Sequence, residues 1–276
     1  MQRRSTGWQR GTTMSKTLYL ECYSGISGDM TVAALLDLGA DREVLKESLK
    51  SLPVGGFRTE ITRVKKSGLD ACDFSVILEQ DNHDHDMEYL HGSEKSYTGH
   101  HEYTHSHEYP HEHRGMKEIT EIIQKSEMTA RAKKMAMRVF GILAQAESKA
   151  HGVPVEEVHF HEVGAVDSIV DIAAIAICMD NLDISNVIVP VLYEGTGFIR
   201  CQHGQIPVPV PAVTHIAETH KLKLKITDIQ GELVTPTGAA VVAAFRTSDR
   251  LPEDFTMLKT GIGAGKRQYR CPGILR

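Results

Sequence analysis

The chain lacks a cysteine framework, a long apolar run and a strong charge of either sign. It has five cysteines and no CxxC pair, which predicts reduced, cytoplasmic thiols rather than disulfides or a thiolate zinc site. The longest apolar run, residues 169–179, is interrupted by Asp171 and is far shorter than the roughly 20 residues that a membrane-spanning helix needs. A net charge of −5 gives no reason to expect nucleic acid or an anionic membrane as partner. No signal peptide is evident, because no apolar core follows the basic residues near the N-terminus.

The chain is long and apolar enough for one large domain or two modest ones, with 276 residues of which 41% are hydrophobic. Composition divides it into four parts. Residues 1–13 are polar and aperiodic, typical of a tail, and 14–80 predict an N-terminal α/β part. Residues 81–114 hold nine of the fifteen histidines and almost no aliphatic side chains, so we expect a flexible, disordered insertion that buries no core. Residues 115–276 predict a helical and α/β part.

Hydrophobic periodicity predicts strands that alternate with helices. Strands are expected from residue 17, in 57–79 as a pair that turns around Lys66–Gly68, in 186–195 and in 222–229. Helices are expected over 30–40, 41–52, 116–126, 129–152, 167–182, 212–220 and 236–245, with an extended entry at 155–164 and an ordered loop at 195–211. This order favours an α/β fold: a mixed sheet with flanking helices and an antiparallel hairpin.

The stretch HFHEVGAVDSIVDI, which begins at His159, gathers polar ligands at the start of an apolar helix. In an extended segment His159 and His161 point to the same side, and in a helix Asp167 and Asp171 share a face. Imidazoles beside carboxylates suit a divalent first-row ion or acid–base chemistry, in which Glu162 also takes part. The structural alternative is a helix capped by the acids, with satisfied histidines. An unpaired buried Asp171 would cost several kcal/mol, so a compensating partner is expected.

Two glycine-containing turns are candidate phosphate sites. In SGISGDM, the residues Ser27, Gly28 and Asp29 lie between a strand and a helix, where backbone amides can bind an anion. In TPTGAA, the residues Thr235, Thr237 and Gly238 open a helix in the same way. Helix caps without a ligand are equally compatible with both patterns.

Two further segments are candidates for metal binding. His203 lies in the Gly-bounded CQHGQIPVPVP, two residues from Cys201, where the pair could hold a soft metal transiently; a segment stiffened by Pro207 and its neighbours is the alternative. The histidines of 81–114 suit collection of nickel, copper or zinc without a fixed geometry, or are a tolerated low-complexity insertion.

Five motifs together resemble the nickel insertion protein LarC family. They are LYLECYSGISGDM, HFHEVGAVDSIVDI, GFIRCQHGQIPVPVPA, ELVTPTGAAV and the closing GIGAGKRQYRCPGILR. The resemblance covers nearly all of the chain from Met14 onward except the His-rich segment.

The resemblance implies an enzyme, a nickel chelatase of the lyase class. It implies insertion of Ni²⁺ into pyridinium-3,5-bisthiocarboxylic acid mononucleotide, so that two sulfurs and a ring carbon hold the metal. It also implies that the reaction consumes CTP and uses Mn²⁺ or Mg²⁺. The product is the nickel-pincer cofactor of lactate racemase and related enzymes. We expect no nucleic-acid or membrane partner, and a homo-oligomer.

The chain departs from the family pattern in two places. It has Glu21 where the family usually has aspartate, and full-length members run well past Arg276. The resemblance places CTP binding in that missing C-terminal region, which some members encode as a separate reading frame. We therefore expect a separate C-terminal chain as a partner.

The residues leave three functions open. They are a nickel chelatase or its N-terminal portion, a nickel-binding chaperone or storage protein without catalysis, and a metal-dependent phosphohydrolase built on His159, His161, Asp167 and Asp171.

Overall fold

The structure is a computed structural model that describes residues 16–79, 114–158, 160, 165–201 and 204–276. Its helices are α1 (Gly28–Leu38), α2 (Arg42–Lys50), α4 (Met116–Lys125), α5 (Ala130–His151), α6 (Val166–Asn181), α7 (Pro211–His220) and α8 (Pro236–Phe245), with a 3₁₀ turn η1 (Val155–Glu157). Its strands are β1 (Lys16–Tyr19), β2 (Phe57–Lys66), β3 (Leu69–Leu78), β4 (Ile184–Ile188), β5 (Leu192–Thr196), β6 (Phe198–Cys201), β7 (Gly204–Pro207), β8 (Leu224–Gln230), β9 (Gly263–Ala264) and β10 (Ile274–Leu275).

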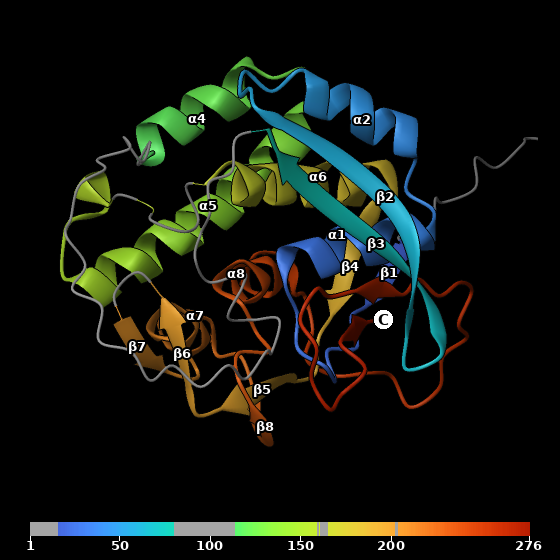
Figure 1. Ribbon diagram of the computed structural model, residues 1–276. Helices are drawn as coiled ribbons and strands as arrows, with labels where there is room; N and C mark the ends of the chain where they lie inside the picture. The colour runs from blue at the N-terminus through green and yellow to red at the C-terminus, as the bar shows by residue number, and fades with distance from the viewer. Residues whose placement is uncertain (1–15, 80–113, 159, 161–164, 202–203) are drawn as a thin grey trace, which may run out of the picture.

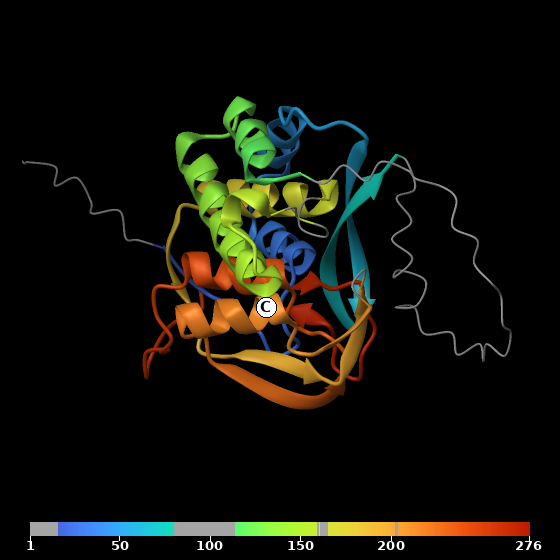
Figure 2. The same ribbon diagram turned by 90° about the vertical axis from the view of Figure 1, so that its left-hand side faces the viewer.

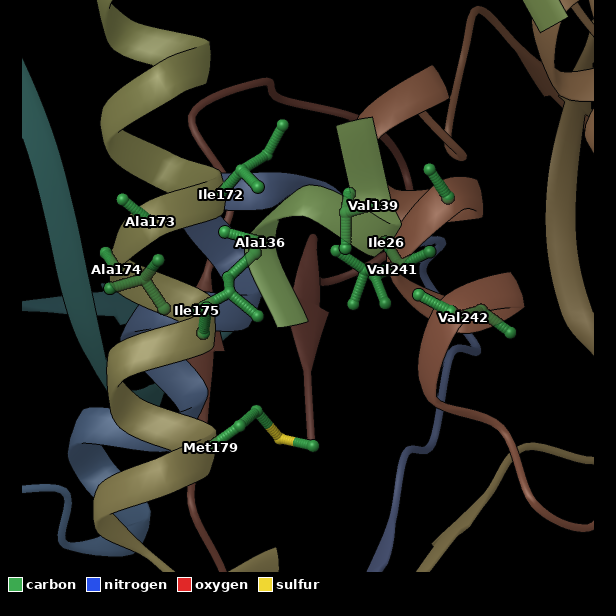
Figure 3. Packing of buried hydrophobic residues seen from close by; sticks show 14 of the residues in the cluster. Ile26, Ala136, Val139, Ile172, Ala173, Ala174, Ile175, Met179, Val241 and Val242 are labelled. Carbon is green, nitrogen blue, oxygen red and sulfur yellow. The ribbon is translucent and has the colours of Figure 1, made fainter. Parts of the chain in front are cut away.

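Helices α1, α5, α6 and α8 form the centre of the molecule. Residues 169–179 of α6 are buried except for Asp171, as is expected for a helix that is apolar all round. Ile175 of α6, Ala136 of α5 and Val241 of α8 belong to one continuous apolar cluster (Figure 3). The many alanines in these helices allow the backbones to approach closely. None of the helices in the described ranges has the length and apolar character needed to cross a bilayer.

The strands form short sheets around these helices. β1 pairs in parallel with β4, β5 pairs in parallel with β8, and β6 pairs antiparallel with β7. The long antiparallel hairpin β2–β3 packs on α1 and α6 and is extended by β9 and β10 (Figure 1). The β5–β8 ribbon lies at the opposite edge of the molecule from α2 and α4 (Figure 2). The predicted α/β class and the antiparallel hairpin are confirmed.

Three local predictions were wrong. The single strand expected over 186–195 is two strands with different partners, because Pro190 interrupts it and cannot donate a ladder hydrogen bond. The loop expected over 195–211 contains the β6–β7 hairpin, since Pro207 lies at its edge and does not prevent pairing. Residues 155–157 form a 3₁₀ turn instead of an extended segment, and this turn starts directly after Pro154. Of the predicted His-rich segment 81–114, residues 81–113 lie outside the described residues.

The C-terminal segment lies directly on α1. A Cβ atom added at Gly261 would lie 2.3 Å from the carbonyl oxygen of Ala34, and one at Gly263 would lie 2.1 Å from that of Met30. The segment is held there by hydrogen bonds from Ile262 N to Asp37 Oδ2 (2.8 Å) and from Cys72 N to Ile262 O (2.9 Å). The alternating glycines of this motif therefore allow two backbones to touch.

Replacement of Gly263 by alanine should lower the free energy of unfolding by about 1–3 kcal/mol, because the new methyl group has no room beside α1. Urea denaturation measures the change. Gly55→Ala is the matched control, since a Cβ there meets nothing within 4 Å, and it should stay within about 0.5 kcal/mol of wild type. Equal stability of Gly263→Ala and wild type would contradict the close approach.

Candidate functional site

The two glycine-containing turns lie side by side in the fold. Ile26 N donates to Leu233 O, and Thr235 N donates to Ile26 O, both at 3.0 Å. Gly238 lies so close that an added Cβ would be 2.2 Å from Ile26 O. Helices α1 and α8 therefore begin beside each other, which brings together the candidate residues Ser27, Gly28, Asp29, Thr235, Thr237 and Gly238.

Side chains at the two helix starts are already engaged. Thr235 Oγ1 accepts a hydrogen bond from Gly238 N (3.1 Å), so the capping interpretation is confirmed at α8. Ser27 is the N-cap residue of α1 by position, but its hydroxyl donates to Asp29 Oδ1 and caps no backbone amide. The capping alternative therefore does not hold for the Ser27 side chain, because the neighbouring carboxylate accepts its hydrogen bond. Backbone amides at these starts are candidate donors to an anion.

Asp171 of α6 reaches the start of α1. A Cβ atom added at Gly28 would lie 2.5 Å from Asp171 Oδ2, so only glycine leaves room for this carboxylate. Oδ1 of Asp171 is shielded from solvent and has no hydrogen-bond partner among the described residues. No described group therefore donates a hydrogen bond to this oxygen.

Burial and neighbouring negative charges raise the pKa values of both Asp171 and Asp29. The pKa of Asp171 is raised well above its ordinary value, first by burial and then by the negative charges of Asp29 and Asp167. The pKa of Asp29 is also raised, mainly by burial, although its hydrogen bond from Ser27 acts in the opposite direction. Asp167, four residues before Asp171, is exposed. The sequence predicted the Asp167–Asp171 pair but not that Asp29 would join it.

Lys266 is the cation of this cluster, and the sequence did not single it out. Its Nζ donates to Asp73 and to Ser75 Oγ (2.7 Å), both on β3, and its charge lowers the pKa of Asp29 and of Asp171. The signal that could have found it is the closing motif GIGAGK, in which three glycines that permit close packing end in a single lysine. We call Asp29, Asp73, Asp171 and Lys266 the carboxylate–lysine cluster.

The cluster offers oxygen ligands for a cation but does not complete a metal site. Within the part of the chain that the structure describes, no three His, Cys, Asp or Glu side chains are arranged to hold a metal ion. Four candidate ligands or proton carriers fall outside that part: His159, His161, Glu162 and His203. The side chain of Cys201 also lies outside it.

The buried carboxyl group of Glu194 accepts backbone hydrogen bonds from the turn before α8. Glu194 Oε1 accepts hydrogen bonds from the backbone amides of Gly195 (2.7 Å), Leu233 (2.8 Å) and Val234 (3.1 Å). Burial raises the pKa of Glu194 to about 7, against the opposite effect of these three amides. Because Leu233 and Val234 pair with Ile26, this one carboxyl group orders both candidate anion sites.

Glu232, which is buried, and Arg267, which is half-buried, form an ion pair at the same turn. Arg267 Nη1 donates to Glu232 Oε2 at 2.8 Å, and Tyr269 Oη donates to the Glu232 carbonyl at 3.0 Å. The sequence analysis missed Glu194 and Glu232. The available signal was an isolated acid between apolar residues in LYEG and GELV.

Comparison with known proteins identifies the family of the chain. A family model described as "Nickel insertion protein" matches residues 18–276. The chain belongs to the nickel insertion protein family. All the candidate residues above fall inside the matched range, and the resemblance expected from the five motifs is confirmed.

Relatives within the nickel insertion family are similar over almost the whole chain. A pyridinium-3,5-bisthiocarboxylic acid mononucleotide nickel insertion protein of Alkaliphilus metalliredigens (strain QYMF) is 53% identical over 264 residues, 95% of this chain and 60% of the relative. A protein of the same name from Clostridium acetobutylicum is 42% identical over 266 residues, 95% of this chain and 63% of the relative. A putative nickel insertion protein of Geobacter sp. (strain M21) is 39% identical over 262 residues, with 95% and 60% covered. No solved structure matches.

The chain matches only part of the length of these relatives. The chain spans about 60% of the length of the relatives named above. Activities of the whole relatives therefore need not reside in this chain alone.

Glu194→Gln should remove a pH dependence of stability. The unfolded carboxyl group ionises near pH 4.5 and the folded one near 7, so wild type should lose stability as the pH rises between these values and then level off. The difference between variant and wild type should grow over that window by about 3 kcal/mol, since one pKa unit corresponds to about 1.36 kcal/mol. Urea denaturation from pH 4 to 8.5 measures it. The exposed Glu253→Gln should follow wild type; a Glu194→Gln profile parallel to wild type would refute the assignment.

Proposed function

We propose that this chain provides the metal-handling part of an enzyme that inserts Ni²⁺ into pyridinium-3,5-bisthiocarboxylic acid mononucleotide. Nickel is the substrate here and leaves with the product. The proposal is supported by family membership, by the printed names of two relatives and by one structural observation. That observation is the meeting of Asp29 and Asp171 at the start of α1, where Asp171 keeps a buried oxygen without a partner.

In this proposal the two carboxylates receive the nickel ion. A desolvated carboxylate pair attracts a divalent cation because the ion offsets the burial that raises both pKa values and the repulsion of Asp171 by Asp29. Two oxygen ligands are too few, so His159 and His161, which precede α6 in the chain, supply imidazoles, with Asp167 and His203 as further ligands. Oxygen and imidazole hold nickel less strongly than the soft sulfurs of the thiolated nucleotide. The ion therefore passes from the protein to the substrate.

Asp171 then accepts the proton that the reaction releases. Formation of the nickel–carbon bond breaks a carbon–hydrogen bond of the pyridinium ring, so Ni²⁺ replaces H⁺ at that carbon. Once the ion has moved to the sulfurs, the freed carboxylate of Asp171 is again buried and basic. A carboxyl group with a raised pKa is a suitable proton acceptor near neutral pH. Glu162 carries the proton onward to solvent.

The neighbouring helix starts bind the phosphate of the nucleotide. Backbone amides at the start of α8, around Thr237 and Gly238, are the better donors, because Asp29 opposes an anion at the start of α1. Ser27, Gly28 and Thr235 lie beside this phosphate site, at the starts of α1 and α8.

The region that relatives carry beyond the matched part supplies the remaining steps. CTP binds there with Mn²⁺ or Mg²⁺, either on the same polypeptide or on a separate C-terminal chain, and the assembled enzyme is a cytoplasmic homo-oligomer. The product is the nickel-pincer cofactor used in lactate racemase maturation, and the reaction is that of a chelatase of the lyase class.

Asp171→Asn should separate stability from function. Loss of the buried carboxylate, whose Oδ1 lacks a hydrogen bond among the described residues, should raise the free energy of unfolding at pH 8 by about 1–3 kcal/mol. Nickel binding, measured by equilibrium dialysis, and transfer to the thiolated nucleotide, followed by mass spectrometry, should both fall on the order of 100-fold. Asp29→Asn should lose nickel in the same way.

The exposed Asp254→Asn is the control for loss of one negative charge and should behave as wild type. Full nickel transfer by Asp171→Asn, measured with CTP, Mn²⁺ and the C-terminal region of the Alkaliphilus relative present, would refute the proposed site.

A further inference from the structure

The closing motif of the chain places the positively charged side chain of Lys266 beside the proposed nickel site. Gly261 and Gly263 lie against α1 with no space for side chains, so the segment follows the helix toward its start. Gly265 continues this path, since an added Cβ there would lie 2.9 Å from Met30 Sδ. Lys266 then reaches the carboxylate–lysine cluster.

The backbone at Lys266 is anchored on its other side as well. The next residue, Arg267, forms the ion pair with Glu232, and Tyr269 donates to the carbonyl of the same glutamate. These contacts are made with the turn before α8, whereas Gly261, Gly263 and Gly265 contact α1. Lys266 is therefore held between the two helix starts, and its side chain is only partly exposed, at 35%.

The ammonium group of Lys266 has capacity left for a ligand. A lysine has three N–H donors, and among the described residues two of them serve Asp73 and Ser75. Its charge acts on Asp29 and Asp171, so it lies within electrostatic reach of the proposed nickel ligands. A fixed positive charge at that place weakens the binding of any cation. Its presence is explained if an anionic group arrives together with the ion.

We propose that Lys266 forms an anion subsite beside the paired carboxylates and binds an anionic group of the pyridinium mononucleotide. The proposal rests on the proposed function. The positive charge orients the substrate so that its sulfur donors face the ion that Asp29 and Asp171 hold. The anionic group is either the phosphate or a ring carboxylate or thiocarboxylate, which share charge and hydrogen-bond acceptors.

Lys266→Gln should change the affinities for the two ligands in opposite directions. Binding of Ni²⁺ alone should become tighter, on the order of tenfold, because a neighbouring positive charge is removed. Binding of nicotinate mononucleotide, a pyridinium carboxylate probe, should become roughly 10-fold to 100-fold weaker, because a charged hydrogen bond is lost. Isothermal titration calorimetry measures both. Lys266→Arg should restore most of the nucleotide affinity.

Two further probes identify the group that Lys266 recognises. Nicotinamide mononucleotide keeps the phosphate and lacks the carboxylate, while nicotinate riboside keeps the carboxylate and lacks the phosphate. If Lys266 binds phosphate, the substitution weakens only the first; if it binds the carboxylate, only the second. An equal loss for the neutral-headed nicotinamide riboside would indicate a disturbed fold and would overturn the proposal.

Lys46→Gln on α2 is the matched control, since it removes the same charge from an exposed lysine and should change neither affinity. If Lys266→Gln does not fold, Asp73→Asn tests the same idea in reverse: it releases Lys266 from its ion pair and should tighten nucleotide binding.

The outcomes separate this inference from the proposed function. Wild type that binds neither Ni²⁺ nor any nucleotide probe would refute both. Wild type that binds both ligands, with a Lys266→Gln variant of unchanged affinities, would refute only the subsite.

Discussion

The backbone pairing of Ile26 with Leu233 and Thr235 is the interaction on which the site depends. It joins the turn after β1 to the turn before α8, so that two helices distant in the sequence begin at one place. Gly238 permits the approach, and Glu194 supports the second turn through three backbone amides. Without this pairing Asp29 and the amides of α8 would not share a surface.

The start of α1 also holds two buried carboxyl groups, Asp29 and Asp171, whose pKa values are raised. Asp171 presses against Gly28, repels Asp29 and keeps a buried oxygen without a partner among the described residues. A buried carboxylate of this kind costs stability, and proteins tolerate such a cost mainly at sites of chemistry. Burial of the surrounding apolar core offsets the destabilisation that these carboxyl groups cause.

The C-terminal motif connects the separate parts of the site. Its glycines fit against α1, Lys266 enters the carboxylate–lysine cluster, and Arg267 holds the turn before α8 through Glu232. A segment about ten residues long thus touches both helix starts.

Sequence periodicity by itself determined the helices and the β2–β3 hairpin, because these follow from local patterns, and the resemblance of five motifs indicated the family. It placed Asp167 and Asp171 on one helix and Ser27 and Thr235 at helix starts. Only tertiary structure decided that Asp171 faces Asp29, that Lys266 joins them and that Glu194 lies beneath the second turn. Such contacts depend on how closely backbones approach at Gly28, Gly238 and Gly263, and no local pattern encodes a distance between segments two hundred residues apart.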